Sequence, residues 1–167
     1  MDLSNDRYEI ADALNRYAFG LDHHHADSLA SALTEDCIFD FTPAAKKLGL
    51  RFQLLSGREA ILTGVLPLIG PLDTSHSASN LQIEIDGDAA TLQAYVQSQH
   101  FMPRRGSTAG SDHALLMNRY DCELVRDGAR WRFKRITIAN AWSMGNVDIL
   151  NAVAEQYAIR TKAKKGG

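Results

Sequence analysis

Two long runs in the second half of the sequence alternate between apolar and polar residues, and they limit the possible folds more than any other feature. Residues 77–101 carry Asp-Gly-Asp near their centre, and residues 113–142 carry Arg-Asp-Gly-Ala near theirs. Alternation is typical of strands with one buried face, and Asp-Gly between two such strands is a strong hairpin signal. The second half therefore predicts two antiparallel hairpins. The polar, glycine-containing residues 103–112 between them are typical of a mobile loop.

The first half of the sequence predicts helices. A helix from about residue 4 to about residue 20 carries an apolar stripe at helical spacing, made of Ile10, Leu14, Tyr17 and Leu21. The further elements that we expect are a helix at 27–33, a strand at 37–42, a helix at 57–69 that Pro67 stops or bends, and a last helix at 146–165.

Helices followed by a long antiparallel meander indicate an α+β fold, with the helices on one face of a curved, antiparallel or mixed sheet. Such a sheet, closed by helices, forms a cone that can hold an apolar ligand. The 167 residues contain no internal repeat and no linker. We therefore expect one domain over residues 1–167, with a core at about 7–142 and a C-terminal helix and tail at 146–167.

Composition argues against several classes of partner. The chain is 45% hydrophobic and 23% charged, with a net charge of −2, so nothing favours binding to nucleic acid or to an anionic membrane. The apolar run at 64–72 is too short to span a bilayer, and no signal peptide is visible. Cys37 and Cys122 lie in apolar, strand-like contexts that favour buried free thiols. We expect a cytoplasmic protein.

Three consecutive histidines, His23, His24 and His25, suggest a metal site at first sight. Adjacent residues on a helix or strand point in different directions, so the three rings cannot easily converge on one ion. We therefore expect a solvated turn here, no bound metal and no cofactor. One of the three could still line the mouth of a pocket.

Asp22 precedes this run and follows the last turn of the first helix. Backbone carbonyls at a helix C-terminus carry partial negative charge, so a carboxylate gains nothing from that position. One interpretation is that Asp22 accepts a hydrogen bond from a backbone N–H of its own turn. The alternative is a partly buried carboxylate that orients a histidine or acts as a base.

His76 and His100 are candidates for that histidine. His76 stands among small residues near the start of a strand, and His100 alternates in register with the largely apolar row Leu92, Ala94, Val96 and Ser98. If the hairpin turns at Gly87–Asp88, the midpoint of positions 76 and 100 falls on the turn. The two histidines are then expected almost directly opposite each other.

Four further residues are weaker candidates for polar anchors in an apolar cavity or for residues at its rim. Asn118 and Tyr120 share one face of their strand, and Asn140 and Trp142 share one face of the last strand. We take all four as candidate substrate-binding residues.

Residues 9–41, 57–61 (GREAI), 74–96 and 119–138, taken in order, resemble the SnoaL-like branch of the nuclear-transport-factor-2-like superfamily. The likeness covers about residues 7–142. It implies a cone-shaped α+β barrel, a fold that hosts dehydratases, isomerases, cyclases, dehydrochlorinases and non-catalytic binding domains.

Within this superfamily, the functional pattern is most similar to that of scytalone dehydratase. The resemblance implies that Asp22, His76 and His100 are catalytic. Hexachlorocyclohexane dehydrochlorinase is similar in its Asp–His pair, which corresponds to Asp22 and His76, but lacks the second histidine; the resemblance therefore implies that Asp22 and His76 contact each other. Scytalone dehydratase carries two tyrosines at the positions of Leu21 and Phe41, so the same reaction on the same substrate is not implied, and both residues become candidate substrate contacts.

These observations predict a cofactor-free lyase that eliminates water from a small hydrophobic substrate of an aromatic or polyketide-like kind. The alternatives are a non-catalytic module that binds a hydrophobic ligand, and an isomerase, cyclase or dehydrochlorinase on the same fold. Relatives with this fold commonly pair or trimerise through the open sheet face. We therefore also expect a homodimer or homotrimer, formed through an uncharged row of Gln93, Tyr95, Gln97 and Gln99.

Overall fold

The fold of the chain is seen in a computed structural model, which describes residues 3–103 and 113–155. Helices and short strands come first: α1 (Leu3–Asp22), α2 (Ala26–Ala32), β1 (Leu33–Asp40), α3 (Thr42–Leu48), β2 (Leu55–Ser56) and α4 (Arg58–Ile69). Four long strands follow: β3 (Asp73–Asp86), β4 (Ala89–Phe101), β5 (His113–Asp127) and β6 (Arg130–Gly145). Residues 148–155 form a helix after β6.

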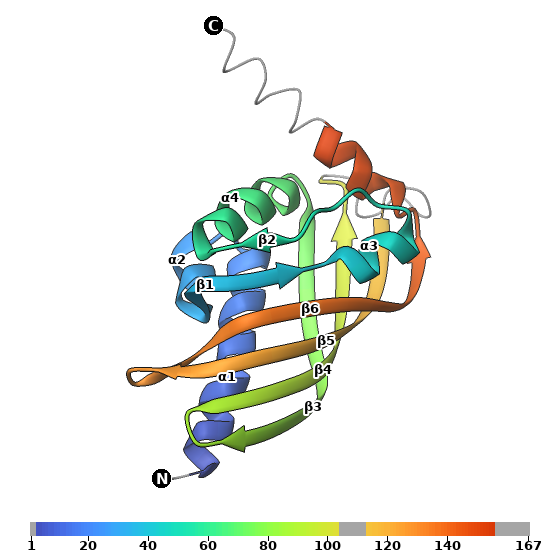
Figure 1. Cartoon of the computed structure of the whole chain (residues 1–167). Helices are drawn as coiled ribbons and strands as arrows, with labels where there is room; N and C mark the ends of the chain where they lie inside the picture. The colour runs from blue at the N-terminus through green and yellow to red at the C-terminus, as the bar shows by residue number, and fades with distance from the viewer. Residues whose placement is uncertain (1–2, 104–112, 156–167) are drawn as a thin grey trace, which may run out of the picture.

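The six strands form one mixed sheet in the order β2-β1-β6-β5-β4-β3. Only the pair β1–β6 is parallel, and every other neighbouring pair is antiparallel. Figure 1 shows that β3 and β4 bend strongly along their length and that α2 and α4 lie beside the C-terminal end of α1. The predicted α+β class and the curved sheet are therefore confirmed.

The predicted stripe of α1 is the part of the helix that the sheet buries. Ile10, Leu14, Tyr17 and Leu21 are each at most 2% exposed and belong to the same apolar core as the inward side chains of β4. Burial of side chains of this size contributes about 1.5–3 kcal/mol each. The stripe therefore fixes which face of α1 meets the sheet, and with it the position of the helix end at Asp22.

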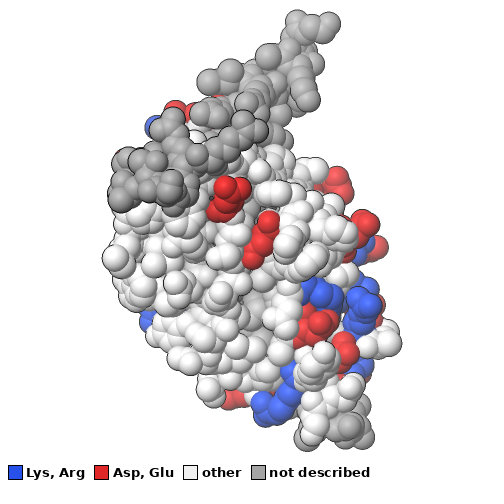
Figure 2. Space-filling view, turned by 180° about the vertical axis from the view of Figure 1, so that it is seen from behind, with Lys and Arg blue, Asp and Glu red and all other residues white. Residues whose placement is uncertain are grey.

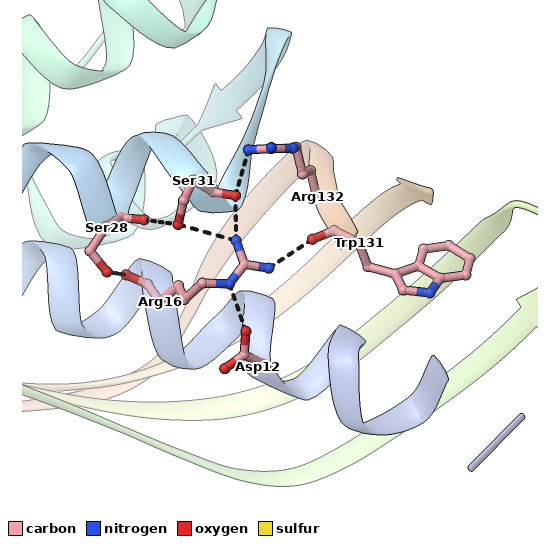
Figure 3. Close-up of polar contacts among 6 residues, drawn as sticks. All are labelled: Asp12, Arg16, Ser28, Ser31, Trp131 and Arg132. Atoms are coloured by element: carbon pink, nitrogen blue, oxygen red, sulfur yellow. Dashed lines mark hydrogen bonds and ion pairs between the residues drawn. The ribbon is translucent and has the colours of Figure 1, made fainter. Parts of the chain in front are cut away.

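Arg16 fastens the middle of α1 to two other elements (Figure 3). Its guanidinium donates to the carboxylate of Asp12 at 2.7 Å, to the carbonyl oxygen of Ser31 at the end of α2, and to the carbonyl oxygen of Trp131 in β6 at 2.9 Å. Arg132 donates to the same Ser31 carbonyl at 2.7 Å. These contacts hold α1 against α2 and the sheet one and a half turns before Asp22.

Both predicted hairpin turns are present. Asp86 pairs with Ala89 around Gly87, and Asp127 pairs with Arg130 around Gly128. The two glycines have φ values of 59° and 64°, the left-handed region that glycine enters without steric cost. The predicted mobile loop falls mainly on residues 104–112, which lie outside the described part of the chain, as does the end of the last predicted helix.

The region before α4 departs from the expectations. The strand β1 begins earlier than predicted and ends at Asp40, so Phe41 is not in a strand but precedes α3 as its N-cap. The helix α3 was not predicted, nor was the two-residue strand β2. In α4, Pro67 stands inside the helix, which continues to Ile69.

Seen from behind, the surface shows acidic and basic side chains mixed along one side and uncharged side chains over much of the other (Figure 2). No single-sign patch of the kind that binds nucleic acid stands out among the residues described on this face. Among the described residues, no helix combines the length and the apolar character that a membrane crossing requires.

Candidate active site

Asp22 closes α1 and contacts β3 through three hydrogen bonds. Its Oδ1 lies 2.6 Å from Nδ1 of His76 and accepts from the hydroxyl of Thr74 at 2.9 Å. Its Oδ2 accepts from the backbone N–H of His76 at 2.8 Å. The expected contact between Asp22 and His76 is therefore present. The turn after α1 is capped instead by His25, whose Nδ1 accepts from the N–H of Ser28 at 3.1 Å.

The environment of Asp22 keeps its carboxylate charged. The side chains of Asp22 and His76 are 17% and 5% exposed. Burial raises the pKa of Asp22, but the hydrogen bonds and charge of His76, together with the Thr74 hydroxyl, outweigh burial and leave that pKa below its ordinary value. A carboxylate on Nδ1 favours the tautomer of neutral His76 that carries its proton there. The lone pair of Nε2 is then free.

A β-bulge directs His76 to the inner face of the sheet. The pairing of β3 with β4 shifts between Ser79 and Gln82, where Asn80 has a φ of 55°. Without the extra residue, a strand that buries Ile83 would point His76 outward, because the two positions are an odd number apart. With the bulge, His76 pairs with the inward-facing Ser98.

Because of the same bulge, the register of the two histidines differs from the expected one. His100 pairs with Thr74, so it is not directly opposite His76 but one inward position away along the strand. The rings nevertheless touch, with centroids 5.7 Å apart and planes at 86°. The expectation that the two histidines meet on one face is correct, and the expectation of direct opposition is wrong.

His100 is a neutral imidazole in an apolar wall. It is 3% exposed, and its Nδ1 is buried without a hydrogen-bond partner in the described residues. Burial, with the neighbouring His76, lowers the pKa of His100 from 6.5 to about 4. A buried polar atom without a partner costs about 1–3 kcal/mol, so this ring sits in the wall at some cost to stability.

Both histidines line a cavity of about 110 Å³ between the sheet and the helices, which opens to solvent. A concave, mainly apolar site with a few polar groups is typical of small-molecule binding. The walls are mainly apolar and come from distant parts of the chain, including Leu21 of α1, Phe39 of β1, Val65 of α4 and Ile138 of β6. Asp22 is not among the lining residues and lies behind His76.

Four of the six predicted substrate-binding residues line this cavity: Leu21, Phe41, Asn118 and Tyr120. Asn140 is buried but does not line it, and Trp142 is 45% exposed. The prediction for Trp142 is wrong because β6 holds a second bulge: Asn140 pairs with Asn118 but Trp142 pairs with Met117, so Ala141 is the extra residue. The bulge turns Trp142 to the outer face.

Asn140 instead supports Asn118. Its side-chain amide donates to Oδ1 of Asn118 at 3.0 Å, and the amide of Asn118 lies 3.5 Å from the hydroxyl of Ser98. Tyr17 and Tyr120 meet edge to face at 6.2 Å beside them, and burial raises the pKa of both phenols. These groups form a polar patch of neutral donors and acceptors on the wall of an otherwise apolar cavity.

Several lining residues were not predicted. Tyr17 was assigned to the apolar stripe, where its hydroxyl on an inward face was the available signal. Ser98 was read as part of the inward row of β4 without a role. Arg51 and Phe52 lie between α3 and β2, in a segment without periodicity, so no pattern in the sequence could have found them.

The histidine run forms a solvated turn, as expected. His23, His24 and His25 are all exposed, and the ring of His23 stacks on Phe19 at 4.2 Å. No group of three or more histidine, cysteine, aspartate or glutamate side chains within residues 3–103 and 113–155 could hold a metal ion. Cys37 and Cys122 are free and buried, as predicted.

The fold is shared with proteins of known structure. The structure superposes on the Kfla4162 protein from Kribbella flavida with a TM-score of 0.78 and 24% identity, over 90% of this chain and 99% of the other. It superposes on a putative scytalone dehydratase from Novosphingobium aromaticivorans with a TM-score of 0.71 and 24% identity, over 87% and 91%. It superposes on a type 2 hexachlorocyclohexane dehydrochlorinase (LinA) with a TM-score of 0.71 and 19% identity, over 86% of this chain and 90% of the other.

A relative is also found by sequence. The terrestric acid biosynthesis cluster protein E of Penicillium crustosum is 32% identical over 145 residues, which is 85% of this chain and 87% of that protein. A model of the SnoaL-like domain matches residues 2–137. This chain, with its curved sheet and its cavity lined by two histidines, belongs to the SnoaL-like domain family.

Proposed function

We propose that the protein is a cofactor-free lyase that eliminates water from a small hydrophobic substrate. The hydrogen bond of 2.6 Å between Asp22 and Nδ1 of His76 carries this proposal. It leaves Nε2 of a cavity-lining imidazole as a base, oriented by a carboxylate whose pKa is lowered.

In the proposed reaction, Nε2 of His76 removes a proton from a carbon beside a carbonyl group. The electrons of that C–H bond form a carbon–carbon double bond while the C–O bond to a hydroxyl group on the next carbon breaks. The leaving hydroxide takes the proton from Nε2 and departs as water. His76 is neutral again, and no electron acceptor or donor is needed.

His100 acts in this scheme as a neutral hydrogen-bond donor. With a pKa of about 4, it is almost never protonated at neutral pH, so it is a poor source of a proton for the leaving group. Its ring lines the cavity beside His76, and in this proposal an N–H of the neutral imidazole donates to the carbonyl oxygen that gains negative charge. A neutral imidazole performs this task without titrating near neutral pH.

The cavity and the comparisons support a hydrophobic substrate. The walls are mainly apolar, and the relative from Penicillium crustosum bears the name of a cluster for the biosynthesis of a small molecule. Leu21 and Phe41 stand where the resemblance to scytalone dehydratase placed tyrosines, and both line the cavity. We therefore propose a different substrate from that of scytalone dehydratase.

A non-catalytic hydrophobic-ligand carrier is the second candidate, and the missing tyrosine hydroxyls favour it. An isomerase, cyclase or dehydrochlorinase would use the same base and differ in the leaving group or in where the proton returns. A carrier, however, gains nothing from a carboxylate bonded to a cavity-lining histidine, which is why elimination is preferred.

The test is a screen of hydroxylated aromatic and polyketide-like ketones, with loss of water read by mass spectrometry. Wild type should convert at least one compound, and His76→Ala should lower that turnover by about 10²–10⁴-fold. His23→Ala is the matched control, because it removes an exposed imidazole from the turn beside Asp22 and should leave turnover unchanged. Binding without turnover in both wild type and His76→Ala would favour the carrier.

A further inference from the structure

Arg51 stands apart from the other residues around the cavity. Among the described lining residues, it is the only lysine, arginine, aspartate or glutamate. It lies between α3 and β2, and it is exposed, whereas the two histidines are buried. The cavity therefore has mainly apolar walls and one cation at its solvent-exposed part, which we call the mouth.

The neighbours of Arg51 hold its segment over the cavity. The ring of Phe52 packs edge to face on Phe39 at 5.7 Å and on Phe41 at 5.4 Å. The backbone N–H of Leu50 donates to the carbonyl oxygen of Ala45, in the middle of α3, at 2.9 Å. Arg51 is thus placed at the mouth by packing on both sides of it.

The guanidinium of Arg51 has no hydrogen bond or ion pair with any described residue. In contrast, Arg16, Arg126 and Arg132 each pair with an aspartate at 2.7–2.8 Å. These three guanidinium groups fasten parts of the fold together, whereas the one that lines the cavity is available to a ligand. An arginine fork binds a carboxylate through two parallel hydrogen bonds, which adds direction to the attraction.

We propose that the cavity takes an amphipathic anion, a ligand with an apolar body and a carboxylate or similar anionic group that binds Arg51. This inference rests on the proposed function insofar as the ligand is the substrate of the lyase. The charge distribution sets the orientation: Asp22 is ionised behind His76 and repels an anion at the inner wall, while Arg51 attracts it at the mouth. The apolar body then lies against the histidines.

Two fluorescent probes test this inference without any turnover. 1-Anilinonaphthalene-8-sulfonate and N-phenyl-1-naphthylamine share one aromatic skeleton and differ in the anionic sulfonate. Each should displace the other from wild type, as expected for a common cavity. Arg51→Gln should weaken binding of the sulfonate about fivefold, the size expected for an exposed charge pair, and leave binding of the neutral probe unchanged. Arg51→Lys should retain part of the sulfonate affinity.

The matched control is Lys46→Gln, which removes an exposed positive charge from the nearby helix α3 without touching the cavity. It should leave both affinities unchanged. The inference is overturned if Arg51→Gln weakens both probes equally or neither, if Lys46→Gln has the same effect as Arg51→Gln, or if the two probes do not compete. The probe experiment measures no reaction. If His76→Ala contradicted the lyase proposal, the probe result would still stand. If the probes contradicted the anion proposal, the lyase proposal would still stand.

Discussion

The two ends of α1 each hold an aspartate that is bonded to the sheet, buried at Asp6 and partly buried at Asp22, and their partners differ in kind. Asp6, in the first turn, accepts from both terminal nitrogens of Arg126 at 2.8 and 2.9 Å and from the indole N–H of Trp131 at 3.1 Å. Asp22, in the last turn, is bonded to Thr74 and His76. Arginine stays charged at every accessible pH, whereas an imidazole can take up and give back a proton.

The helix itself treats the two carboxylates differently. Asp6 lies near the positive end of the helix dipole, and its hydrogen bonds from Arg126 and Trp131 outweigh burial and lower its pKa. Asp22 lies at the negative end, where no basic residue occupies the last turn. Only the second aspartate contacts a residue that lines the cavity. A buried acid with a permanent cation therefore indicates a structural fastener, and a buried acid with an imidazole facing a cavity indicates chemistry.

Asp22→Asn should have the largest effect on turnover, and this effect should distinguish the two ends of α1. An amide cannot hold Nδ1–H of His76 as a carboxylate does, and it allows the tautomer that blocks Nε2. The corresponding change in serine protease triads costs about 10⁴-fold. We expect a loss of at least about 10²-fold in kcat/KM for the compound found by the screen, with a small change in melting temperature. A loss of less than about threefold would mean that Asp22 is a fastener like Asp6.

His100→Gln should have the next largest effect on turnover. Glutamine keeps a donor of similar reach but places it differently, so kcat should fall at least about tenfold. The melting temperature should change little, because the substitution also removes a buried Nδ1 that has no partner among the described residues. Unfolding of His100→Gln at room temperature would show that the ring is a structural part of the wall and would remove it from the mechanism.

The sequence predicted the sheet better than it predicted the site, for physical reasons. Alternation and Asp-Gly turns are local properties, so the hairpins around Gly87 and Gly128 could be found from the chain alone. A bulge depends on two strands at once. The conflict between inward Ile83 and inward His76, with Asn80 between them, was the available signal for the first bulge. The bulge at Ala141 left no such signal in the sequence, and for that reason the predicted position of Trp142 was wrong.

Short elements held by distant contacts were missed for a related reason. The helix α3 is fastened by Lys47, which donates to the carbonyl oxygens of Asn140 and Ala141 at 3.0 and 2.5 Å. That contact joins residues far apart in the sequence, so local periodicity does not report it. The contact between Asp22 and His76 also joins distant residues, yet it was predicted, because the family resemblance supplied the pairing that local patterns lack.

Lowering the pH should destabilise the fold through His100, whose ring touches His76 at the Asp22 end of α1. Its pKa is about 4 in the folded protein and close to 6.5 in the unfolded chain, so the unfolded chain binds the extra proton first as pH falls. Stability present above pH 6.5 is therefore lost between about 6.5 and 4, by at most roughly 3 kcal/mol. Urea unfolding across this range should show a smaller loss in His100→Gln than in wild type. Equal losses would mean that His100 is already protonated in the fold.

The smallest expected effect on turnover belongs to Asp6→Asn, which tests the structural half of the comparison. The change leaves Arg126 without one of its two acidic partners and replaces a bidentate carboxylate with an amide, while Asp88 still pairs with Arg126 at 2.8 Å. The first turn of α1 should loosen, and the melting temperature should fall by several degrees. Turnover measured well below the transition should match wild type, because the core stripe and Arg16 hold the other end of the helix independently. Arg16→Gln is the useful comparison, because it removes the hydrogen bonds through which Arg16 holds the helix in place. If Asp6→Asn alone lowered kcat/KM as much as Asp22→Asn, the two ends would be mechanically coupled and the division between fastener and chemistry would be wrong.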